Sequence, residues 1–250
     1  MKISVLTVCL NSEKTIKDTI ESVIDQNYKC YEHIIVDGKS SDNTLDIIQE
    51  YSDNDKIKIY SEKDEGIYFA MNKALALSSG DFVGFLNSDD IFASNDVLKE
   101  ISNHTDYYDC IYGNVDFTEE NDLKKVVRKW ISNDFIPGSM MKGWMPHHES
   151  FYCKRKILEE FSGFNTQYFG ASDYDLMLRI LESKRFKSKW VDKVFVRQRL
   201  GGQSNISIKN MLANNFEALS IRNSQRKFKL PLDFGFFAKP LSKIKQYFNT

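Results

Sequence analysis

Hydrophobic residues in the first half of the chain alternate between short continuous runs and segments with helical spacing. The runs of strand length are residues 2–8, 31–36, 56–60 and 81–86. The segments with helical spacing are residues 11–26, 40–51 and 67–79. In the first of these, Ile16, Ile20, Val23 and Ile24 fall on one helical face, and Ser12 is the expected N-cap. Continuously apolar strands joined by helices predict a mostly parallel sheet that is buried on both faces.

The second half of the chain has a less regular pattern. Helices are expected at residues 94–104, 155–164 and 174–185. Strands are expected at residues 110–117, 124–130, 147–154, 185–190 and 193–200. The sequence has no internal repeat, and its Gly and Pro are too sparse for a flexible linker. We therefore expect one α/β domain of two lobes, residues 1–92 and 93–208, followed by a helical tail at residues 209–250.

Composition narrows the classes of protein to consider. With 250 residues, 42% hydrophobic and 28% charged, the chain has the make-up of a soluble globular protein. Its net charge of −1 gives no electrostatic reason to expect a nucleic-acid partner. We find no signal peptide and no apolar stretch near the ~20 residues of a membrane span. The four scattered cysteines form no CxxC motif, which favours reduced thiols and a cytoplasmic protein.

Polar and acidic residues follow all four strands of the predicted parallel sheet. They are Cys9 to Asn11, then Asp37 to Ser40, then Asp64 to Gly66, and finally Asn87 to Asp90. Ligands of open α/β sheets bind beyond these strand ends. The first turn, TVCLNSEK, has neither the GxGxxG motif of dinucleotide sites nor a Walker loop. Carboxylates suit Mg²⁺ or Mn²⁺ bridging to a diphosphate, although Asp89 could instead cap the turn before Ile91.

Four stretches, taken in order, resemble the bacterial family 2 glycosyltransferases of the GT-A fold. They are ISVLTVCLNSEKTIKDTIESVIDQNY, HIIVDGKSSDNTLDII, EGIYFAMNKALALSSGDFVGFLNSDD and ASDYDLMLRI. The later RLGGQS resembles a segment typical of a subset that builds surface polysaccharides. The resemblance implies a Rossmann-like, mostly parallel sheet flanked by helices, with a mixed acceptor-side lobe, over residues 1–208. It also implies a nucleotide-diphosphate-sugar donor, with a UDP-sugar favoured, a Mn²⁺ or Mg²⁺ cofactor and inversion at the sugar C1.

The resemblance assigns donor-side roles by position. Asn87-Ser88-Asp89 stands at the place of the family's DxD motif, with Asp89 as the metal ligand and Asp90 beside it. Asn87 keeps a hydrogen-bonding oxygen at the first position but lacks the charge of Asp. Other implied contacts are Thr7, Cys9 and Asn11 in the nucleoside pocket, Asp37 on the base, and Asp64 and Asn72 in the donor segment.

The second lobe should supply a base that removes the proton of the acceptor hydroxyl. ASDYDLMLRI offers Asp173 and Asp175, and the resemblance gives the base position to Asp173. The alternative for Asp173 is a first-turn carboxylate favoured by the helix dipole. Two residues apart on a helix, the two side chains point in different directions, so Asp175 should be structural and pair with an Arg.

Other polar and aromatic residues of the second lobe are candidate contacts to the acceptor or diphosphate. His147 and His148 should face opposite sides of a strand, and His148 is the favoured contact; a packed strand histidine is the alternative. Trp144 and Tyr152 could stack on a sugar or belong to the core. The Gly201-Gly202 loop could fold over a diphosphate or form a plain turn.

The tail interleaves lysines with Phe, Leu and Ile between Lys227 and Phe248. That pattern suits an anionic membrane surface and a lipid-linked acceptor, whereas packing against the domain is the alternative.

The sequence thus predicts an inverting glycosyltransferase that extends a lipid-linked saccharide, in the cytoplasm or on the inner face of the membrane. A sugar nucleotidyltransferase would need a Gly-rich basic loop after the first strand, which is absent. A non-catalytic saccharide-binding or scaffold protein remains the alternative of a different class.

Overall fold

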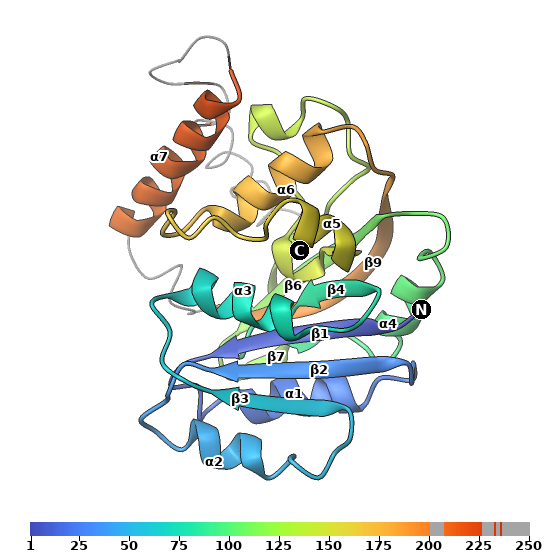
Figure 1. Cartoon of the computed structure of the whole chain (residues 1–250), viewed down its shortest axis with the longest axis vertical. Coiled ribbons are helices and arrows are strands. Elements are labelled where there is room, and N and C mark those ends of the chain that lie inside the picture. The colour runs from blue at the N-terminus through green and yellow to red at the C-terminus, as the bar shows by residue number, and fades with distance from the viewer. Residues whose placement is uncertain (201–207, 227–232, 234–235, 237–250) are drawn as a thin grey trace.

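A single curled sheet runs through the molecule, with helices packed on both of its faces (Figure 1). The computed structural model describes residues 1–200, 208–226, 233 and 236. The strand order is β3-β2-β1-β4-β8-β6-β9-β5, with β7 paired to β6. The strands are β1 Ile3–Cys9, β2 Tyr31–Asp37, β3 Ile57–Ser61, β4 Phe82–Phe85, β5 Ile91–Phe92, β6 Cys110–Glu119, β7 Asp122–Trp130, β8 Tyr152–Lys154 and β9 Ser188–Arg199. The helices are α1 Ile16–Ile24, α2 Thr44–Gln49, α3 Ile67–Leu77, α4 Val97–Ser102, α5 Arg155–Glu160, α6 Ser172–Glu182 and α7 Ile208–Ser224, with 3₁₀ turns η1 Met140–Lys142 and η2 His148–Ser150.

The first half of the chain forms the parallel part of the sheet, as predicted. Strands β3, β2, β1 and β4 are parallel neighbours, and every residue of β1 and β2 is buried. Ile16 and Ile20 of α1 pack with Ile48 of α2 against one face. Helix α3 covers the other face, where Met71 and Ala74 share a core with β1, β2 and α6. Burial on both faces explains why these strands are apolar throughout.

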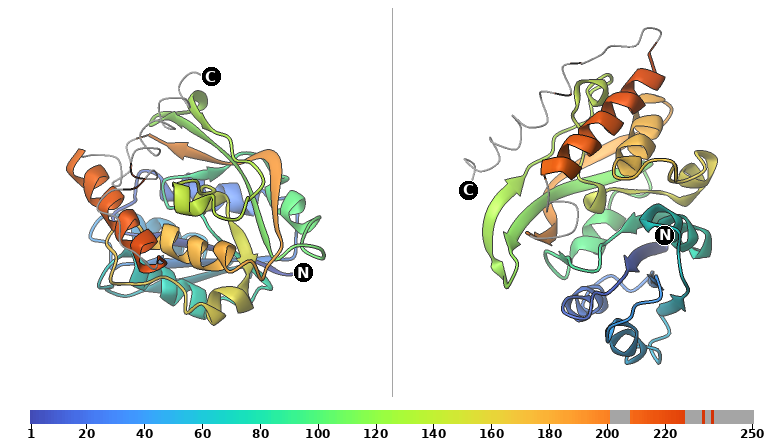
Figure 2. Two further views of the ribbon diagram at one scale, coloured as in Figure 1. Left: turned by 90° about the horizontal axis from the view of Figure 1, so that it is seen from above. Right: turned by 90° about the vertical axis from the view of Figure 1, so that its left-hand side faces the viewer.

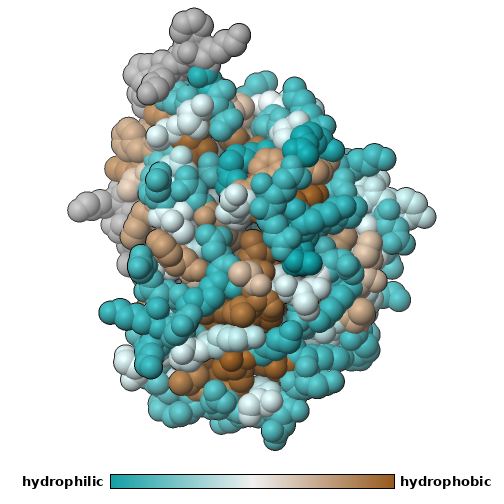
Figure 3. Space-filling view, in the orientation of Figure 1, coloured by the Kyte–Doolittle hydropathy of each residue, from teal (hydrophilic) through white to brown (hydrophobic). Residues whose placement is uncertain are grey.

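The second half extends the same sheet with mixed strand directions. Strand β8 is antiparallel to β4 and β6, and β9 runs parallel to β6. Figure 2 shows the β6–β7 hairpin curving away from the parallel strands. Figure 3 shows that the face seen in Figure 1 is mainly hydrophilic, with hydrophobic surface in its middle part. In the part of the chain that the structure describes, no helix combines the length and hydrophobicity needed to cross a bilayer.

Three local predictions were wrong. Helix α1 begins at Ile16 rather than after Ser12, whose hydroxyl instead lies 2.8 Å from that of Ser88. The strand expected at residues 147–154 is a 3₁₀ turn followed by the short β8. The two strands expected at residues 185–190 and 193–200 are one strand, because irregularities in the β6–β9 register let β9 run on.

Candidate active site

The turn after β4, residues 87–90, stands at the predicted metal position. Hydrogen bonds within the turn and from Arg199 hold it in place. The Asp90 N–H donates to the Asn87 carbonyl (3.2 Å), which closes the turn. Arg199, at the end of β9, donates its backbone N–H to Asp90 Oδ1 (2.9 Å) and its guanidinium to the Asp89 carbonyl (2.5 Å). The Arg199 guanidinium also pairs with Asp18 of α1. Asp89 itself is half-buried at this edge of the sheet.

A second carboxyl, Glu149 of η2, lies against Asp90 below the turn. Both side chains have no exposed surface. Burial raises the pKa of Asp90 to about 7. Burial and the nearby Asp90 charge raise the pKa of Glu149 well above its usual range. Burial disfavours the charged form of this pair, whereas Asp89 is the half-buried carboxyl of the group. Burial also raises the pKa of Asp89, while the Arg199 charge opposes that rise.

His148 lies between the donor-side and acceptor-side aspartates. Its Nδ1 is 3.5 Å from Asp173 Oδ2. Desolvation lowers the pKa of His148, and the negative charges of Asp173 and Asp89 oppose that shift, which means that both carboxylates lie near the ring. The turn at η2 stacks the rings of His147 and His148, with centroids 5.2 Å apart. The opposite-facing strand geometry predicted for the two histidines is therefore wrong.

Asp173 sits in the first turn of α6, with its side chain one-fifth exposed. Two residues on, Asp175 pairs with Arg179 at 2.8 Å and is buried, as predicted for a structural carboxylate. The start of α6 is tied to α3, because the Ser172 N–H donates to the Tyr68 hydroxyl (3.3 Å). This contact sets Asp173 relative to the donor-side lobe.

Two of the predicted donor-side residues, Asn11 and Asp64, lie in loops at the sheet edge. Asn11 is exposed and has a left-handed backbone (φ 54°), and its side-chain oxygen accepts the Ser41 N–H at 2.8 Å. Asp64 pairs through Oδ1 with Lys73. Its buried Oδ2 has no hydrogen-bond partner among the described residues. An unsatisfied buried acceptor is costly unless a ligand supplies a donor, so Asp64 remains a candidate donor contact.

Three other predicted donor contacts lie one layer below the surface. Thr7, Cys9 and Asp37 are all buried. Thr7 donates to the Leu86 carbonyl (2.8 Å), and the Asp37 carboxylate accepts hydrogen bonds from Ser40 and from Ser61 (2.6 Å). The nucleoside contacts of Thr7 and Cys9 stay predictions, and in this structure both side chains are buried. The nucleobase contact of Asp37 stays a prediction, because in this structure its oxygens hold the neighbouring loops.

Three further predicted residues make packing contacts. The Asn72 amide donates to the Phe164 carbonyl and accepts the Phe164 N–H, both at 2.8 Å, so it joins α3 to the segment after α5 instead of facing a donor. Trp144 packs beside Tyr112 and Phe135. Tyr152 is fully buried, which is the core alternative. Gly202 lies outside the described residues.

The donor set fits a metal that is shared with a ligand. Within residues 1–200, 208–226, 233 and 236, no three His, Cys, Asp or Glu side chains come together as a complete metal site. Asp89 is a half-buried carboxylate at this edge of the sheet, and its metal role stays a prediction. Mg²⁺ and Mn²⁺ sites of nucleotide enzymes commonly take one or two carboxylates and complete their coordination with phosphate oxygens.

Glu149 and Arg199 were missed by the sequence-based prediction. Glu149 stands in HHESFY, next to the two histidines, and Arg199 stands two residues before the paired glycines. A charged residue inside an apolar strand-like segment is the signal that could have found both, because charges are seldom buried without a partner.

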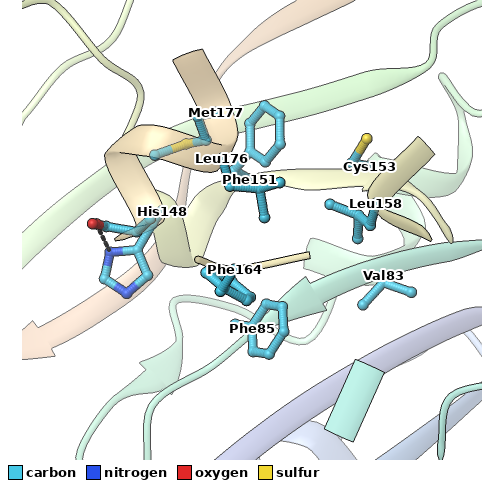
Figure 4. Close-up of a pocket in the computed structure, with 10 residues that line it drawn as sticks. Val83, Phe85, His148, Phe151, Cys153, Leu158, Phe164, Leu176 and Met177 are labelled. Atoms are coloured by element: carbon cyan, nitrogen blue, oxygen red, sulfur yellow. Dashed lines mark ion pairs between the residues drawn. The ribbon is translucent and has the colours of Figure 1, made fainter. Parts of the chain in front are cut away.

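Behind His148 and Asp173 lies a small pocket, which Figure 4 shows in close-up. Its walls come from β4, β8, α5 and α6, so it lies where the two halves of the molecule meet.

Comparison with known proteins identifies the family. Residues 4–168 match the family described as Glycosyl transferase family 2. The chain belongs to this family. It is therefore a glycosyltransferase, and the expected fold is confirmed by solved structures of GT-A-type enzymes.

Two relatives are similar in sequence. The glycosyltransferase TuaG of Bacillus subtilis, named for teichuronic acid biosynthesis, is 40% identical over 101 residues, which are 40% of this chain and 40% of TuaG. WfgD of Escherichia coli, named UDP-Glc:alpha-D-GlcNAc-diphosphoundecaprenol beta-1,3-glucosyltransferase, is 28% identical over 253 residues, covering 99% of this chain and 91% of WfgD.

Two solved structures share the fold. S. aureus TarS 1-349 in complex with UDP-GlcNAc has a TM-score of 0.66 at 18% identity, covering 100% of this chain and 73% of that one. The mannosyltransferase PcManGT of Pyrobaculum calidifontis, in complex with GDP-Man and Mn²⁺, has a TM-score of 0.66 at 18% identity, covering 98% of this chain and 69% of that one.

Proposed function

We propose that this glycosyltransferase moves a sugar from a UDP-sugar to a saccharide on a lipid diphosphate, in the assembly of a bacterial surface polysaccharide. The transfer inverts C1, uses Mn²⁺ or Mg²⁺ and is carried out by residues 1–208. The name of WfgD, which covers almost the whole chain, supports a UDP-sugar and a lipid-diphosphate acceptor. The UDP-GlcNAc complex of TarS and the Mn²⁺ complex of PcManGT support the donor class and the metal.

The observation that carries this proposal is the grouping of Asp89, His148 and Asp173. The three come from the turn after β4, from η2 and from α6, yet His148 is close to both carboxylates. An inverting transfer needs a metal-binding carboxylate on the side of the leaving diphosphate and a base on the side of the acceptor. A carboxylate from each lobe, both near one ring, meets that requirement.

Asp173 then acts as the base. It takes the proton of the acceptor hydroxyl as that oxygen attacks C1 from the side opposite the diphosphate. His148 is a neighbour that holds the Asp173 carboxylate in place. When bound at Asp89, the metal neutralises charge on the departing diphosphate. Arg199 keeps Asp89 in position through the backbone of the turn.

Loss of Asp89 should remove metal-dependent nucleotide binding. A nucleotide at 100 times its Kd stabilises a protein by about 2.7 kcal/mol, which a thermal-shift assay detects readily. We expect UDP to stabilise the wild type more strongly with Mn²⁺ than without, and Asp89→Ala to lose the difference. Exposed Asp53 provides the control variant Asp53→Ala, which should keep it. An unchanged Mn²⁺ effect in Asp89→Ala would refute the metal role.

Loss of the base should affect chemistry and spare donor binding. We expect Asp173→Asn to lower kcat by about 10²–10⁴-fold, since that is the usual contribution of general-base catalysis. Its Kd for UDP with Mn²⁺ should match the wild type, as should that of Asp134→Asn, a control at an exposed aspartate. Equal losses of donor affinity and of turnover would take Asp173 out of the base role.

The non-catalytic alternative makes a different prediction. A saccharide-binding or scaffold protein would bind glycans without hydrolysing or transferring from any nucleotide sugar. A wild-type protein that binds no nucleotide in the presence of Mn²⁺ or Mg²⁺ would favour that alternative over transfer.

A further inference from the structure

The pocket behind Asp173 has one polar end and one apolar end. Figure 4 shows His148 at one end, joined to Asp173, and Val83, Leu158 and Cys153 at the other. Between them stand the rings of Phe85, Phe151 and Phe164 and the side chains of Leu176 and Met177. All of the apolar side chains of this wall are buried.

The pocket is the right size for a very small group. Its volume is about 30 Å³, whereas a cavity needs roughly 10–15 Å³ to admit one group the size of a water molecule. A buried water needs two to four polar partners, and the apolar end offers none in its lining. A methyl group buried there would be stabilised by the transfer of its apolar surface out of water, and a water molecule at the same place would gain no such free energy.

The position of the pocket points to the acceptor. A base must lie within hydrogen-bond reach of the hydroxyl whose proton it takes. The substituent on the next ring carbon therefore lies close to Asp173 as well. Asp173 and His148 are the partly exposed residues of the pocket lining, so the pocket is placed to receive that substituent.

We propose that this pocket binds the acetamido group of an N-acetylated acceptor sugar, with its methyl group at the apolar end and the nucleophilic hydroxyl on the adjacent ring carbon. The inference rests on the proposed function, because it needs Asp173 to act as the base.

An acetamido group matches the pocket in chemistry as well as in size. Its amide lies next to the sugar ring, where His148 and Asp173 provide polar partners, and its methyl lies farthest from the ring. A neutral imidazole offers both a donor and an acceptor to such an amide. A hydroxyl in the same place would leave the apolar end empty, and a longer acyl chain would clash with the ring of Phe164 or with the β4 wall.

Acceptor analogues test the inference directly. Lipid-diphosphate-linked sugars that differ only at the substituent beside the nucleophile, as hydroxyl, N-acetyl or N-butanoyl, would be compared by kcat/KM with the full chain. We expect the N-acetyl acceptor to be preferred over the hydroxyl acceptor by about 10–200-fold, the range for small apolar groups in such pockets. The N-butanoyl acceptor should be poorer than N-acetyl.

Two variants of the pocket wall should change these preferences in opposite directions. Val83→Leu shortens the apolar end and should reduce the preference for N-acetyl, whereas Met177→Ala should make room for N-butanoyl. Val115→Leu makes the same addition at a fully buried valine of another core cluster and should leave the ratios unchanged. Each result is a ratio between acceptors in one variant, so a loss of folded protein cancels.

The outcomes separate the inference from the proposed function. Transfer to hydroxyl and N-acetyl acceptors at equal kcat/KM would overturn the inference alone. A preference for an acceptor with a deoxy-sugar methyl group over one with an acetamido group would also overturn the inference. Equal effects of Val83→Leu and Val115→Leu would overturn it too. Intact UDP–Mn²⁺ binding without transfer to any of these acceptors would overturn the proposed function, and the inference with it.

Discussion

His33 shows how one buried polar residue positions the edge of the candidate site. The Thr7 hydroxyl gives its proton to the Leu86 carbonyl (2.8 Å), so His33 Nε2, at 2.9 Å, must donate to Thr7. The chain of contacts ends immediately before the turn that carries Asp89. Burial lowers the pKa of His33 to about 3, which keeps the imidazole neutral in the folded protein.

Removal of His33 should therefore change the pH dependence of stability. Below about pH 6.5 the unfolded chain protonates this histidine and the folded protein does not, so its contribution to folding falls by about 1.4 kcal/mol per pH unit until the folded pKa is reached. Between pH 7.5 and pH 5, we expect the wild type to lose about 2 kcal/mol more unfolding free energy than His33→Gln. Urea unfolding at both pH values measures the difference.

A second histidine provides the comparison for this experiment. His104→Gln removes a half-buried histidine beside Tyr108, away from the sheet edge. If His33→Gln and the wild type lose the same unfolding free energy over this pH range, the neutral buried state of His33 is refuted.

The contacts of single residues also explain which site residues could be predicted from the sequence. Asp89 and Asp173 follow from strand ends and from the family resemblance. Thr7 and Asp37 stand at strand ends of the same kind, yet their side chains are covered. The cover comes from Leu86, Ser40 and Ser61, which belong to neighbouring strands and loops. Hydrophobic periodicity within one segment cannot show which neighbour covers a polar side chain.

At the scale of elements, a glycine allows the parallel and antiparallel parts of the sheet to approach each other closely. Gly84 of β4 lies beneath the ring of Tyr152 in β8. A Cβ at this position would be 2.6 Å from Tyr152 Cδ1 and closer still to two other ring atoms. Glycine inside a strand commonly marks such a close approach. The large buried ring fills the space that the missing side chain leaves.

Gly84→Ala should therefore destabilise the protein by about 1–3 kcal/mol, the usual cost of overpacking a core. Tyr152→Leu should remove the overlap, so the double variant should lose less than the sum of the two single losses. Gly38→Ala is the control, because a Cβ there would make only ordinary contacts, at 3.5 Å or more. Additive losses in urea unfolding of the double variant would contradict the overlap.

The elements that the sequence predicted best are those whose pattern is local. Continuous apolar runs and helical spacing identified the four parallel strands and α1 to α3. The turn at η2 was missed because its residues form side-chain contacts outside the segment: the Ser150 hydroxyl donates to the Gly113 or His147 carbonyl. The continuity of β9 depends on its irregular register with β6, which no pattern within β9 reveals.

At the scale of the whole molecule, strand order brings the two reacting sides together. Strand β8 inserts between β4 and β6, so η2 and α6 meet the end of the parallel sheet. Asn72–Phe164 and Tyr68–Ser172 then link α3 to the acceptor side. The sequence predicted two lobes but not this order of strands, because pairing between distant segments leaves no local pattern.

A buried ion pair joins helix α7 to the segment of the chain that follows it. Arg222 is 1% exposed and holds Asp233, a residue of the predicted tail, through two hydrogen bonds of 2.7 and 2.8 Å. Arg226 pairs with the same carboxylate at 2.8 Å. The rings of Phe216 and Phe236 are also in contact. Asp233 and Phe236 therefore pack on α7, which is itself part of the predicted tail; the other residues of the predicted membrane-binding segment, 227–248, lie outside the described residues.

Asp233→Ala should destabilise the protein far more than loss of an exposed pair, because it leaves a buried guanidinium without its carboxylate. We expect a loss of about 3–5 kcal/mol in urea unfolding, and a smaller loss when Arg222→Met is added, since the uncompensated charge is then gone. Lys17→Ala is the control: its partner Glu21 is 4.0 Å away, both side chains are more than half exposed, and such a pair contributes less than about 1 kcal/mol. If Asp233→Ala costs no more than Lys17→Ala, the pair does not hold Asp233 on α7, and the Phe216–Phe236 contact would have to hold this part of the chain in place.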